Sequence, residues 1–338
     1  MQRHGITRRR FVNLTALGAA STLLPISALA DEDASEPLRF GVIADVHKDV
    51  MHDADQRLRL FVEEMKREKV DFIIQLGDFC VPIDANLPFL KIWNSFSGPR
   101  YHVLGNHDTD GAGDHPDRFK RSETVEYWGM EDRYYSFDKQ GIHFVVLDGN
   151  DQGPGQQPYY RWVAEDQLKW LTADLENTQL PTIVFVHQSP ERPEDGGLEN
   201  GKQVQEILEQ ANQNQARKKV VACLSGHHHR DYLRQINGIL YSQINSASYY
   251  WLGGNYLKVR YSPEIDKAYP YIKYTVPYQD PLFAVVTLDR AHGFLQIEGR
   301  RTEFVGPSPW ELGASREELD AATLMPRISN WKTPVGMI

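Results

Sequence analysis

Short apolar runs alternate with amphipathic stretches along most of the chain. Residues 38–44 form an almost wholly apolar run, which is typical of a strand buried on both faces. Residues 54–69 place apolar side chains on one side of a helical pattern and charged side chains on the other. The same criteria predict further strands at 70–76, 101–104, 182–186, 219–224 and 239–244, and further helices at 86–97, 165–177 and 202–216.

Pairs of neighbouring apolar runs predict two hairpins, 134–137 with 142–147 and 283–288 with 293–299. The segment 149–164 is rich in Gly, Pro, Gln and aromatic residues, and we expect a long irregular insertion there. No clear strand is expected after residue 302. Because strands first alternate with helices and then predominate, the pattern indicates a single α/β domain with mixed sheets.

The first 30 residues have the pattern of an export signal. Residues 8–10 are all arginine, a moderately apolar stretch covers 14–30, and residues 28–30 form a small-residue cleavage site. Consecutive arginines before Phe11 resemble the twin-arginine signal of bacteria. We therefore predict a signal peptide over 1–30, the twin-arginine export machinery as a partner, and a periplasmic or secreted bacterial protein. A retained membrane anchor is the alternative, but the stretch is short, Ser/Thr-rich and broken by proline, so no stable span is expected in the mature form.

Composition and charge narrow the class of protein. Of 338 residues, 41% are apolar and 25% charged, which excludes disorder as the main state. Removal of residues 1–30, which hold four arginines and no acidic residue, would change the net charge from −9 to −13. An acidic body does not attract polyanions, so we expect no nucleic-acid polymer as a partner. Cys80 and Cys223 are too few for a disulfide scaffold, and we expect buried free thiols, with a disulfide as the alternative.

Residues able to bind metal follow five of the predicted buried strands. In open α/β sheets the carboxyl ends of the strands face one crevice, so five strands would bring these side chains together. The residues are Asp45 with His47, Asp78, Asn106 with His107 and Asp108, His187, and His227 with His229. Carboxylate, imidazole and amide groups favour divalent ions such as Mn, Fe or Zn, and the lack of a thiolate argues against a structural zinc cluster.

The spacing also suggests chemistry. A carboxylate can bridge two metal ions about 3.5–4 Å apart, and such a pair activates water and neutralises phosphate charge. The neutral ligands limit the negative charge of the site, which leaves it able to attract a phosphate group. The residues therefore predict two divalent metal ions and a small phosphate-ester substrate.

These motifs resemble those of the calcineurin-like metallophosphoesterase superfamily. The matching blocks are Asp45-x-His47, Gly77-Asp78, Gly105-Asn106-His107-Asp108, His187 and Gly226-His227-x-His229, in the family's order over roughly residues 38–300. The resemblance implies two packed mixed β-sheets flanked by helices, a four-layer sandwich. We expect this domain to cover 31–302, with a tail at 303–338 that packs on it.

The resemblance also implies a role for each residue. One metal would be held by Asp45, His47, Asp78 and His229, and the other by Asp78, Asn106, His187 and His227. His107 would face the substrate, stabilise the phosphoryl oxygens and protonate the leaving oxygen, and Asp108 would hold the His107 ring in place. Purple acid phosphatases carry a tyrosine ligand three residues after the bridging aspartate, where this chain has Val81, so a tyrosine–iron site is not expected.

The predicted function is that of a metal-dependent phosphoester hydrolase, a phosphatase or phosphodiesterase in which a metal-bound hydroxide attacks a small phosphate ester. Monoester and diester substrates both remain open. A cell-envelope or phospholipid phosphoesterase is an alternative of the same class, and a metal-bearing scaffold or binding protein is the non-enzyme alternative. An occluded cleft would favour the scaffold.

The other histidines and two aromatic clusters are not expected to bind metal. His102 and His143 are expected in the core, and His52 and His115 on the surface. His228 is expected to point away from the two ligands beside it, as alternate residues of an extended segment do. The aromatic clusters at 159–162 and 249–251 either line the substrate cleft or pack within loops.

Overall fold

The computed structural model describes residues 36–110, 118–155, 160–213 and 218–335. The chain divides into two units at residue 32, and every described residue belongs to the second unit, Asp33–Ile338. The predicted signal peptide at 1–30 therefore lies outside the described residues.

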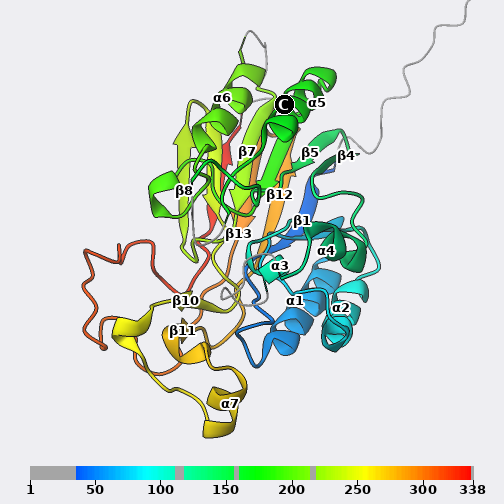
Figure 1. Ribbon diagram of the computed structural model, residues 1–338. Helices are drawn as coiled ribbons and strands as arrows, with labels where there is room; N and C mark the ends of the chain where they lie inside the picture. The colour runs from blue at the N-terminus through cyan, green and yellow to red at the C-terminus, as the bar shows by residue number, and fades with distance from the viewer. Residues whose placement is uncertain (1–35, 111–117, 156–159, 214–217, 336–338) are drawn as a thin grey trace, which may run out of the picture. The chain divides into compact units, whose positions relative to one another are not determined.

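Two six-stranded sheets form the centre of the second unit (Figure 1). In the first sheet, β1 pairs in parallel with β2 and β2 with β3, and the other three strands add in antiparallel orientation on the far side of β1. Its strands, in order across the sheet, are β14 (Trp331–Pro334), β13 (Phe294–Glu298), β12 (Ala284–Asp289), β1 (Leu38–Ile43), β2 (Phe72–Gln75) and β3 (Arg100–His102).

The second sheet has a parallel centre and antiparallel edges. Its strands, in order, are β4 (Tyr135–Lys139), β5 (Ile142–Val146), β6 (Thr182–Val186), β7 (Val220–Ser225), β9 (Ile239–Gln243) and β8 (Tyr232–Ile236). Both sheets are mixed, as the sequence predicts.

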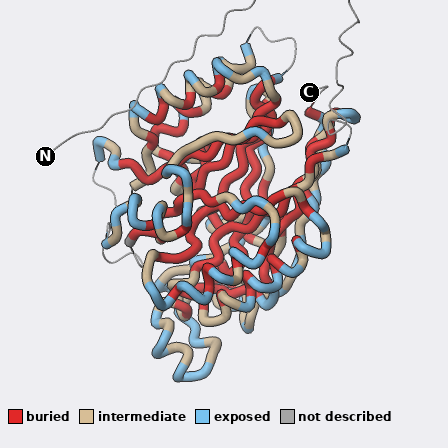
Figure 2. Tube along the Cα trace, turned by 90° about the vertical axis from the view of Figure 1, so that its right-hand side faces the viewer, coloured by how far each residue is buried: buried red, intermediate tan, exposed pale blue. Residues whose placement is uncertain are grey.

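Side-chain alternation along the strands builds the layers. Phe40 and Phe72 of the first sheet contact Phe144 of the second, with ring centroids 6.0 and 5.2 Å away, so these residues form the core between the sheets. Ile73 points to the opposite face of the first sheet because successive strand residues alternate, and it packs with the helices there. Figure 2 shows buried residues concentrated along the strands.

Helices cover the outer faces of both sheets. Those packed on the first sheet are α1 (Ala54–Glu68), α2 (Leu87–Asn94) and α4 (Arg121–Trp128), and those on the second are α5 (Glu165–Asn177) and α6 (Gly201–Ala211). The order helix, sheet, sheet, helix confirms the predicted four-layer sandwich. Within the described ranges, no helix is both long and apolar enough to cross a bilayer.

A tyrosine-rich segment, which we define as residues 249–278, lies beyond the ends of the large sheets (Figure 1). It contains β10 (Tyr249–Trp251), which pairs antiparallel with β11 (Thr275–Pro277), and the short helix α7 (Pro263–Ala268) between them. These elements are not predicted from the sequence, because the segment has no regular alternation of apolar and polar positions.

The prediction that no strand follows residue 302 is wrong, because β14 pairs with β13 at the edge of the first sheet. The strand has only four residues, half-buried or exposed in turn, so its sequence has little apolar signal and backbone pairing with β13 decides its conformation. Before this strand, the tail contacts the second sheet, where the Asp231 carboxylate accepts hydrogen bonds from Arg327 and from Ser329.

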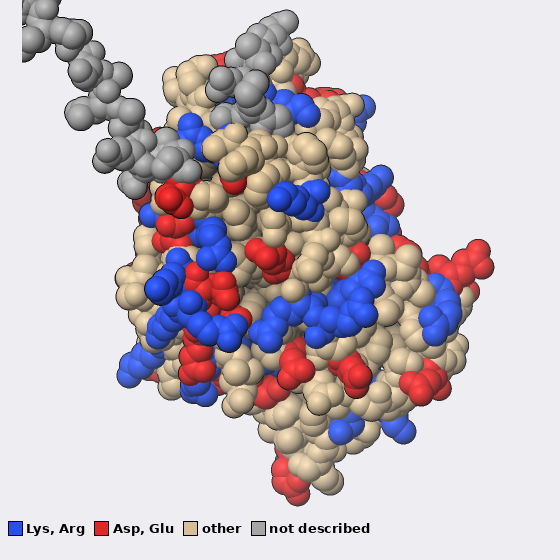
Figure 3. Space-filling view, turned by 180° about the vertical axis from the view of Figure 1, so that it is seen from behind, with Lys and Arg blue, Asp and Glu red and all other residues tan. Residues whose placement is uncertain are grey.

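Charges of both signs mix on the surface. Figure 3 shows a band of Lys and Arg side chains flanked by Asp and Glu on the face opposite to that of Figure 1. Ion pairs such as Arg39 with Glu68, 2.9 Å apart, are one form of this mixing.

Candidate metal centre

The seven residues predicted as metal ligands lie together at the carboxyl ends of the parallel strands. Asp45, His47 and His229 offer ligand atoms that all lie within 4.8 Å of one another. His229 Nε2 is 3.2 Å from Asp45 Oδ1 and 3.2 Å from His47 Nε2. All three residues are buried.

A second group lies beside the first. Asp78, His187 and His227 also offer ligand atoms within 4.8 Å of one another. His187 Nε2 is 3.2 Å from Asp78 Oδ2, 3.3 Å from His227 Nδ1 and 3.2 Å from Asn106 Oδ1. His187 Nδ1 donates to the Leu76 carbonyl at 2.7 Å, which fixes the tautomer and directs Nε2 toward this group.

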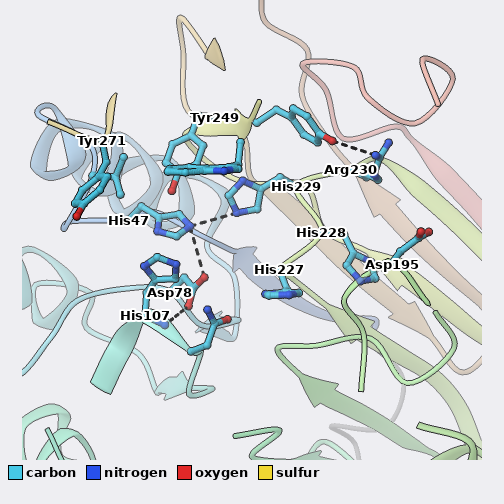
Figure 4. Close-up of a pocket in the computed structure, with 14 residues that line it drawn as sticks. His47, Asp78, His107, Asp195, His227, His228, His229, Arg230, Tyr249 and Tyr271 are labelled. Carbon is cyan, nitrogen blue, oxygen red and sulfur yellow. Dashed lines mark hydrogen bonds and ion pairs between the residues drawn. The ribbon is translucent and has the colours of Figure 1, made fainter. Parts of the chain in front are cut away.

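Asp78 lies between the two groups. The same carboxylate oxygen, Oδ2, is 3.5 Å from Nε2 of His47 in the first group and 3.2 Å from Nε2 of His187 in the second. One oxygen of Asp78 therefore approaches both groups, and Figure 4 shows Asp78 beside His47 and His107 within the cavity.

The donor set fits divalent cations. Imidazole nitrogens of His47 and His229 converge at 3.2 Å, an approach that a shared cation would stabilise. In addition, Nδ1 of His229 is buried with no hydrogen-bond partner among the described residues. Carboxylate, imidazole and amide atoms without a thiolate match borderline to hard metal ions, as expected from the sequence.

The backbone of the site is held in a rarely populated conformation. The residues Asp45, His47, Asp78, His227 and His229 have positive φ angles of 53°, 54°, 52°, 75° and 51°. Non-glycine residues seldom adopt such angles unless the surrounding structure imposes them, and this strain is common at functional sites. The site is also closely packed, because a Cβ at Gly77 would clash with the ring of His187.

Neighbouring charges shift the pKa of several of these side chains. Burial opposes protonation of His187, but the carboxylates of Asp78 and Asp45 raise its pKa to about 9. Burial and the charge of His187 lower the pKa of His227 well below its usual range. Burial opposes ionisation of Asp78, yet His187 and His107 hold its pKa well below the usual value.

His107 is placed by Asp78 and by a residue that the sequence analysis missed. Its backbone N–H donates to Asp78 Oδ1 at 2.8 Å, and its ring Nδ1 lies 2.8 Å from Asp49 Oδ2. Oδ1 of Asp49 is also 3.2 Å from Nδ1 of His47. Burial opposes ionisation of Asp49, but His107 and His47 hold its pKa below the usual value. Its place two residues after His47 in the same loop is the signal that could have indicated this contact.

The expectation that Asp108 holds the His107 ring is wrong. The fully buried Asp108 carboxylate accepts hydrogen bonds from the backbone N–H groups of Asp78, Phe79 and Gly105 at 2.9, 2.6 and 2.7 Å. These groups belong to the loops after β2 and β3, so Asp108 joins the two loops that carry Asp78 and His107. The side chain follows His107 in the sequence but is directed to the opposite side of the loop.

The centre opens into a cavity of about 480 Å³. Metal-site residues and His107 line it together with aromatic residues, and Figure 4 shows Tyr249 beside His47 and His229. The aromatic and charged residues of the lining include Tyr249, Tyr250, Trp251, Tyr271 and Arg230. Tyr249 contacts two predicted ligands, with its ring centroid 4.8 Å from that of His47 and 5.0 Å from that of His229.

Of the two alternatives for the aromatic clusters, a place in the cavity lining applies to residues 249–251. In the cluster at 159–162, Tyr159 lies outside the described residues, and the backbone of Trp162 bonds to Gly149 and Asp151 in the insertion. Both cysteines are buried and free.

The other histidines have structural surroundings. His102 stacks on Trp128 with ring centroids 5.0 Å apart, and His143 lies between Asp138 and Asp174 at 2.6 and 2.8 Å. Nδ1 of His228 faces the Tyr232 hydroxyl at 2.8 Å, although the residue also lines the cavity. His52 packs against Tyr261, while His115 lies outside the described residues.

Comparisons with known proteins agree with this geometry. The family model described as calcineurin-like phosphoesterase matches residues 38–231, which is more than half of the chain and includes every predicted ligand. Among curated proteins, no relative matches the chain.

A solved structure with a TM-score above 0.5 shares the fold at low sequence identity, and two further similar structures score lower. A dimetal phosphatase from Danio rerio is 16% identical with a TM-score of 0.56, and the match covers 81% of this chain and 100% of that one. GAP50, the anchor in the inner membrane complex of Plasmodium, is 16% identical with a TM-score of 0.47, covering 80% of this chain and 89% of that one. An archaeal phosphodiesterase is 12% identical with a TM-score of 0.39, covering 79% and 99%.

Proposed function

Because this chain belongs to the calcineurin-like phosphoesterase family and is a phosphoric ester hydrolase, we propose that it uses two divalent metal ions to hydrolyse a small phosphate ester. Mn, Fe and Zn are the candidate ions. We propose further that the protein works outside the cytoplasm, after export through the signal predicted at 1–30.

The position of Asp78 is the observation that carries the proposal. One of its carboxylate oxygens lies within 3.5 Å of an imidazole nitrogen from each group of ligand atoms. Asp45, His47, Asp78 and His229 would hold one ion, and Asp78, Asn106, His187 and His227 the other. When bound, such a pair supplies a water nucleophile at neutral pH and neutralises the charge of the phosphate.

The protein's own side chains would orient the substrate and move a proton. His107 lines the cavity next to the metal groups, with its Nδ1 held by Asp49. From this position its ring can donate a hydrogen bond to a phosphoryl oxygen and a proton to the leaving alcohol oxygen. Water then adds to phosphorus as the P–O bond to the alcohol breaks, which releases the alcohol and a phosphate.

The shape of the cavity supports an enzyme over a scaffold. A volume of about 480 Å³ lies within the range of small-molecule sites. None of the residues that line it comes from the described part of the tail, 303–335, which supports a cleft open to substrate.

Metal content and chelator sensitivity test the proposal. The mature protein would be purified, its metals per chain measured, and its hydrolysis of a chromogenic monoester and a chromogenic diester compared with and without chelator. We expect two ions per chain and chelator-sensitive turnover. Asp78→Ala should lose the bound metal and the turnover. His143→Gln, which changes a buried histidine outside the centre, should retain the metal and the turnover. Full activity in Asp78→Ala would overturn the proposal.

A further inference from the structure

The tyrosine-rich segment differs in composition from the rest of the protein. Residues 249–278 hold eight of the 16 tyrosines of the chain. The segment is also basic, since its charged residues are Lys258, Arg260, Glu264, Asp266, Lys267 and Lys273, a net charge of +2 in a chain of −9. Tyr249 and Tyr278 are buried and the other six tyrosines are half-buried, so the aromatic ring that the segment exposes most is that of Trp251. Positive charge on a segment of an acidic protein favours a partner of negative charge.

Exposed apolar side chains concentrate in the same segment. Five large apolar residues are exposed in the part of the chain that the structure describes, and three of them are Trp251, Leu257 and Val259, at 45%, 48% and 55%. Leu257 and Val259 flank Lys258, whose backbone N–H donates to the Lys273 carbonyl at 3.0 Å. Isolated exposed apolar residues are ordinary, but these three lie within nine positions of the sequence, and their burial against a partner would be favourable.

The segment adjoins the mouth of the cavity. Trp251 lines the cavity and is 45% exposed, which places it at the mouth, whereas the buried Tyr249 lies deeper, against His47 and His229. One face of Trp251 is covered by Tyr274, with near-parallel rings 5.7 Å apart. Figure 1 shows that β10, β11 and α7 of this segment lie beyond the ends of the two large sheets.

The chemistry of these side chains matches a lipid interface. Tyrosine and tryptophan place an apolar ring in the interfacial region and a polar group toward water. Transfer of leucine and valine side chains from water to the acyl region is favourable, and lysine is attracted to anionic headgroups. A glycan would also stack on the aromatic rings, but its hydroxyls offer little to Leu257 and Val259.

We propose that residues 249–278 dock on an anionic lipid bilayer and bring the mouth of the cavity to its surface. The consequence for the substrate rests on the proposed function: the hydrolysed phosphate ester would be one displayed at that surface. Binding itself does not depend on metal or turnover, so the two proposals can fail separately.

Vesicle binding tests the docking surface. The mature protein would be sedimented with vesicles of phosphatidylcholine alone and with vesicles that contain about one third phosphatidylglycerol. We expect binding to the anionic vesicles and at least about tenfold weaker binding for Leu257→Ser with Val259→Ser, because two apolar contacts are lost. Lys258→Gln should weaken binding to anionic vesicles about fivefold. Leu60→Ser with Leu87→Ser, which changes exposed leucines of α1 and α2 at 40% and 43%, is the matched control and should bind normally.

Activity provides a second readout. Leu257→Ser with Val259→Ser should lower hydrolysis of phosphatidic acid in anionic vesicles and leave hydrolysis of a soluble chromogenic ester unchanged, since neither residue lines the cavity. Unimpaired vesicle binding by this variant, or no binding by the parent protein, would overturn the docking proposal. Binding to isolated peptidoglycan in place of vesicles would also overturn it and identify a glycan partner.

Discussion

Oδ2 of Asp49 lies 2.8 Å from Nδ1 of His107, and this contact holds the ring of the only predicted catalytic histidine. The other oxygen of the same carboxylate is 3.2 Å from Nδ1 of the predicted ligand His47. A carboxylate on one imidazole nitrogen fixes the tautomer and the orientation of the ring. Asp49 is therefore in a position to orient a proton donor and a ligand together.

We expect Asp49→Asn to lower kcat by about 10- to 100-fold, because the His107 ring loses the group that fixes its orientation. Steady-state kinetics across pH would measure the effect, since a role through His107 should also shift the pH profile. In a His107→Asn background, Asp49→Asn should lower kcat little further, because the effects of two residues that act through one another are not additive.

Asp49→Asn could instead act through His47, and metal content separates the two routes. Normal metal content with lowered kcat indicates the His107 route. Additive losses in the double variant would show that Asp49 does not work through His107.

The sequence predicts the positions of those candidate ligands that directly follow buried strands. Asp45, Asp78 and His187 follow buried strands, and parallel strands bring their carboxyl ends to one edge, so their meeting could be predicted without coordinates. The contact between Asp49 and His107 could not, because it depends on two loops that lie 58 residues apart in sequence.

Other differences have similar physical causes. Adjacent residues can face opposite sides of a loop, which is why His107 lines the cavity while Asp108 points into the protein. β14 and the elements of the tyrosine-rich segment are short, and tertiary pairing decides their conformation more than local preference does.

Asp108 should matter for stability. Its carboxylate accepts three backbone N–H groups from two loops, whereas an amide at the same place would offer one oxygen and turn its NH₂ toward a donor. We expect Asp108→Asn to lower the free energy of unfolding by about 2–4 kcal/mol, measured by urea denaturation. His107→Ala should lower kcat without a comparable loss of stability. An Asp108→Asn protein of normal stability would show that these hydrogen bonds contribute little.

Metal affinity should rise with pH. The pKa of His187 is raised to about 9 by the Asp78 and Asp45 carboxylates, so at neutral pH a divalent ion must displace a proton from this ring. The apparent affinity for Mn²⁺ should therefore increase up to about tenfold per pH unit until pH approaches this pKa, measured by equilibrium dialysis. Asn106→Ala removes a ligand without a titratable proton, so it should weaken binding and keep the pH slope. A flat pH profile in the parent protein would contradict the shift.

His143 lies outside the metal centre, and its protonation should make the free energy of unfolding depend on pH. Burial opposes its protonation, but hydrogen bonds to Asp174 and Asp138 raise its pKa. A raised pKa in the folded state stabilises the protein fully below the unfolded value of about 6.5, and this contribution disappears as pH rises through the folded pKa. The loss of unfolding free energy in His143→Gln should thus be larger at about pH 6 than at about pH 9. Equal losses at both values would mean that the histidine contributes through packing alone.

The signal predicted at 1–30 can be tested by exchanging arginine for lysine. Arg8→Lys with Arg9→Lys keeps both positive charges, so a general export route that needs only a basic start would still accept the chain. The twin-arginine route recognises the arginine pair itself, and the double variant should remain in the cytoplasm as the uncleaved precursor. Cell fractionation of a bacterial host, with precursor and mature forms separated by size, measures the outcome. Arg3→Lys, which lies outside the pair, is the matched control and should be exported normally. Normal export of the double variant would assign the protein to another route and leave the metal centre unaffected.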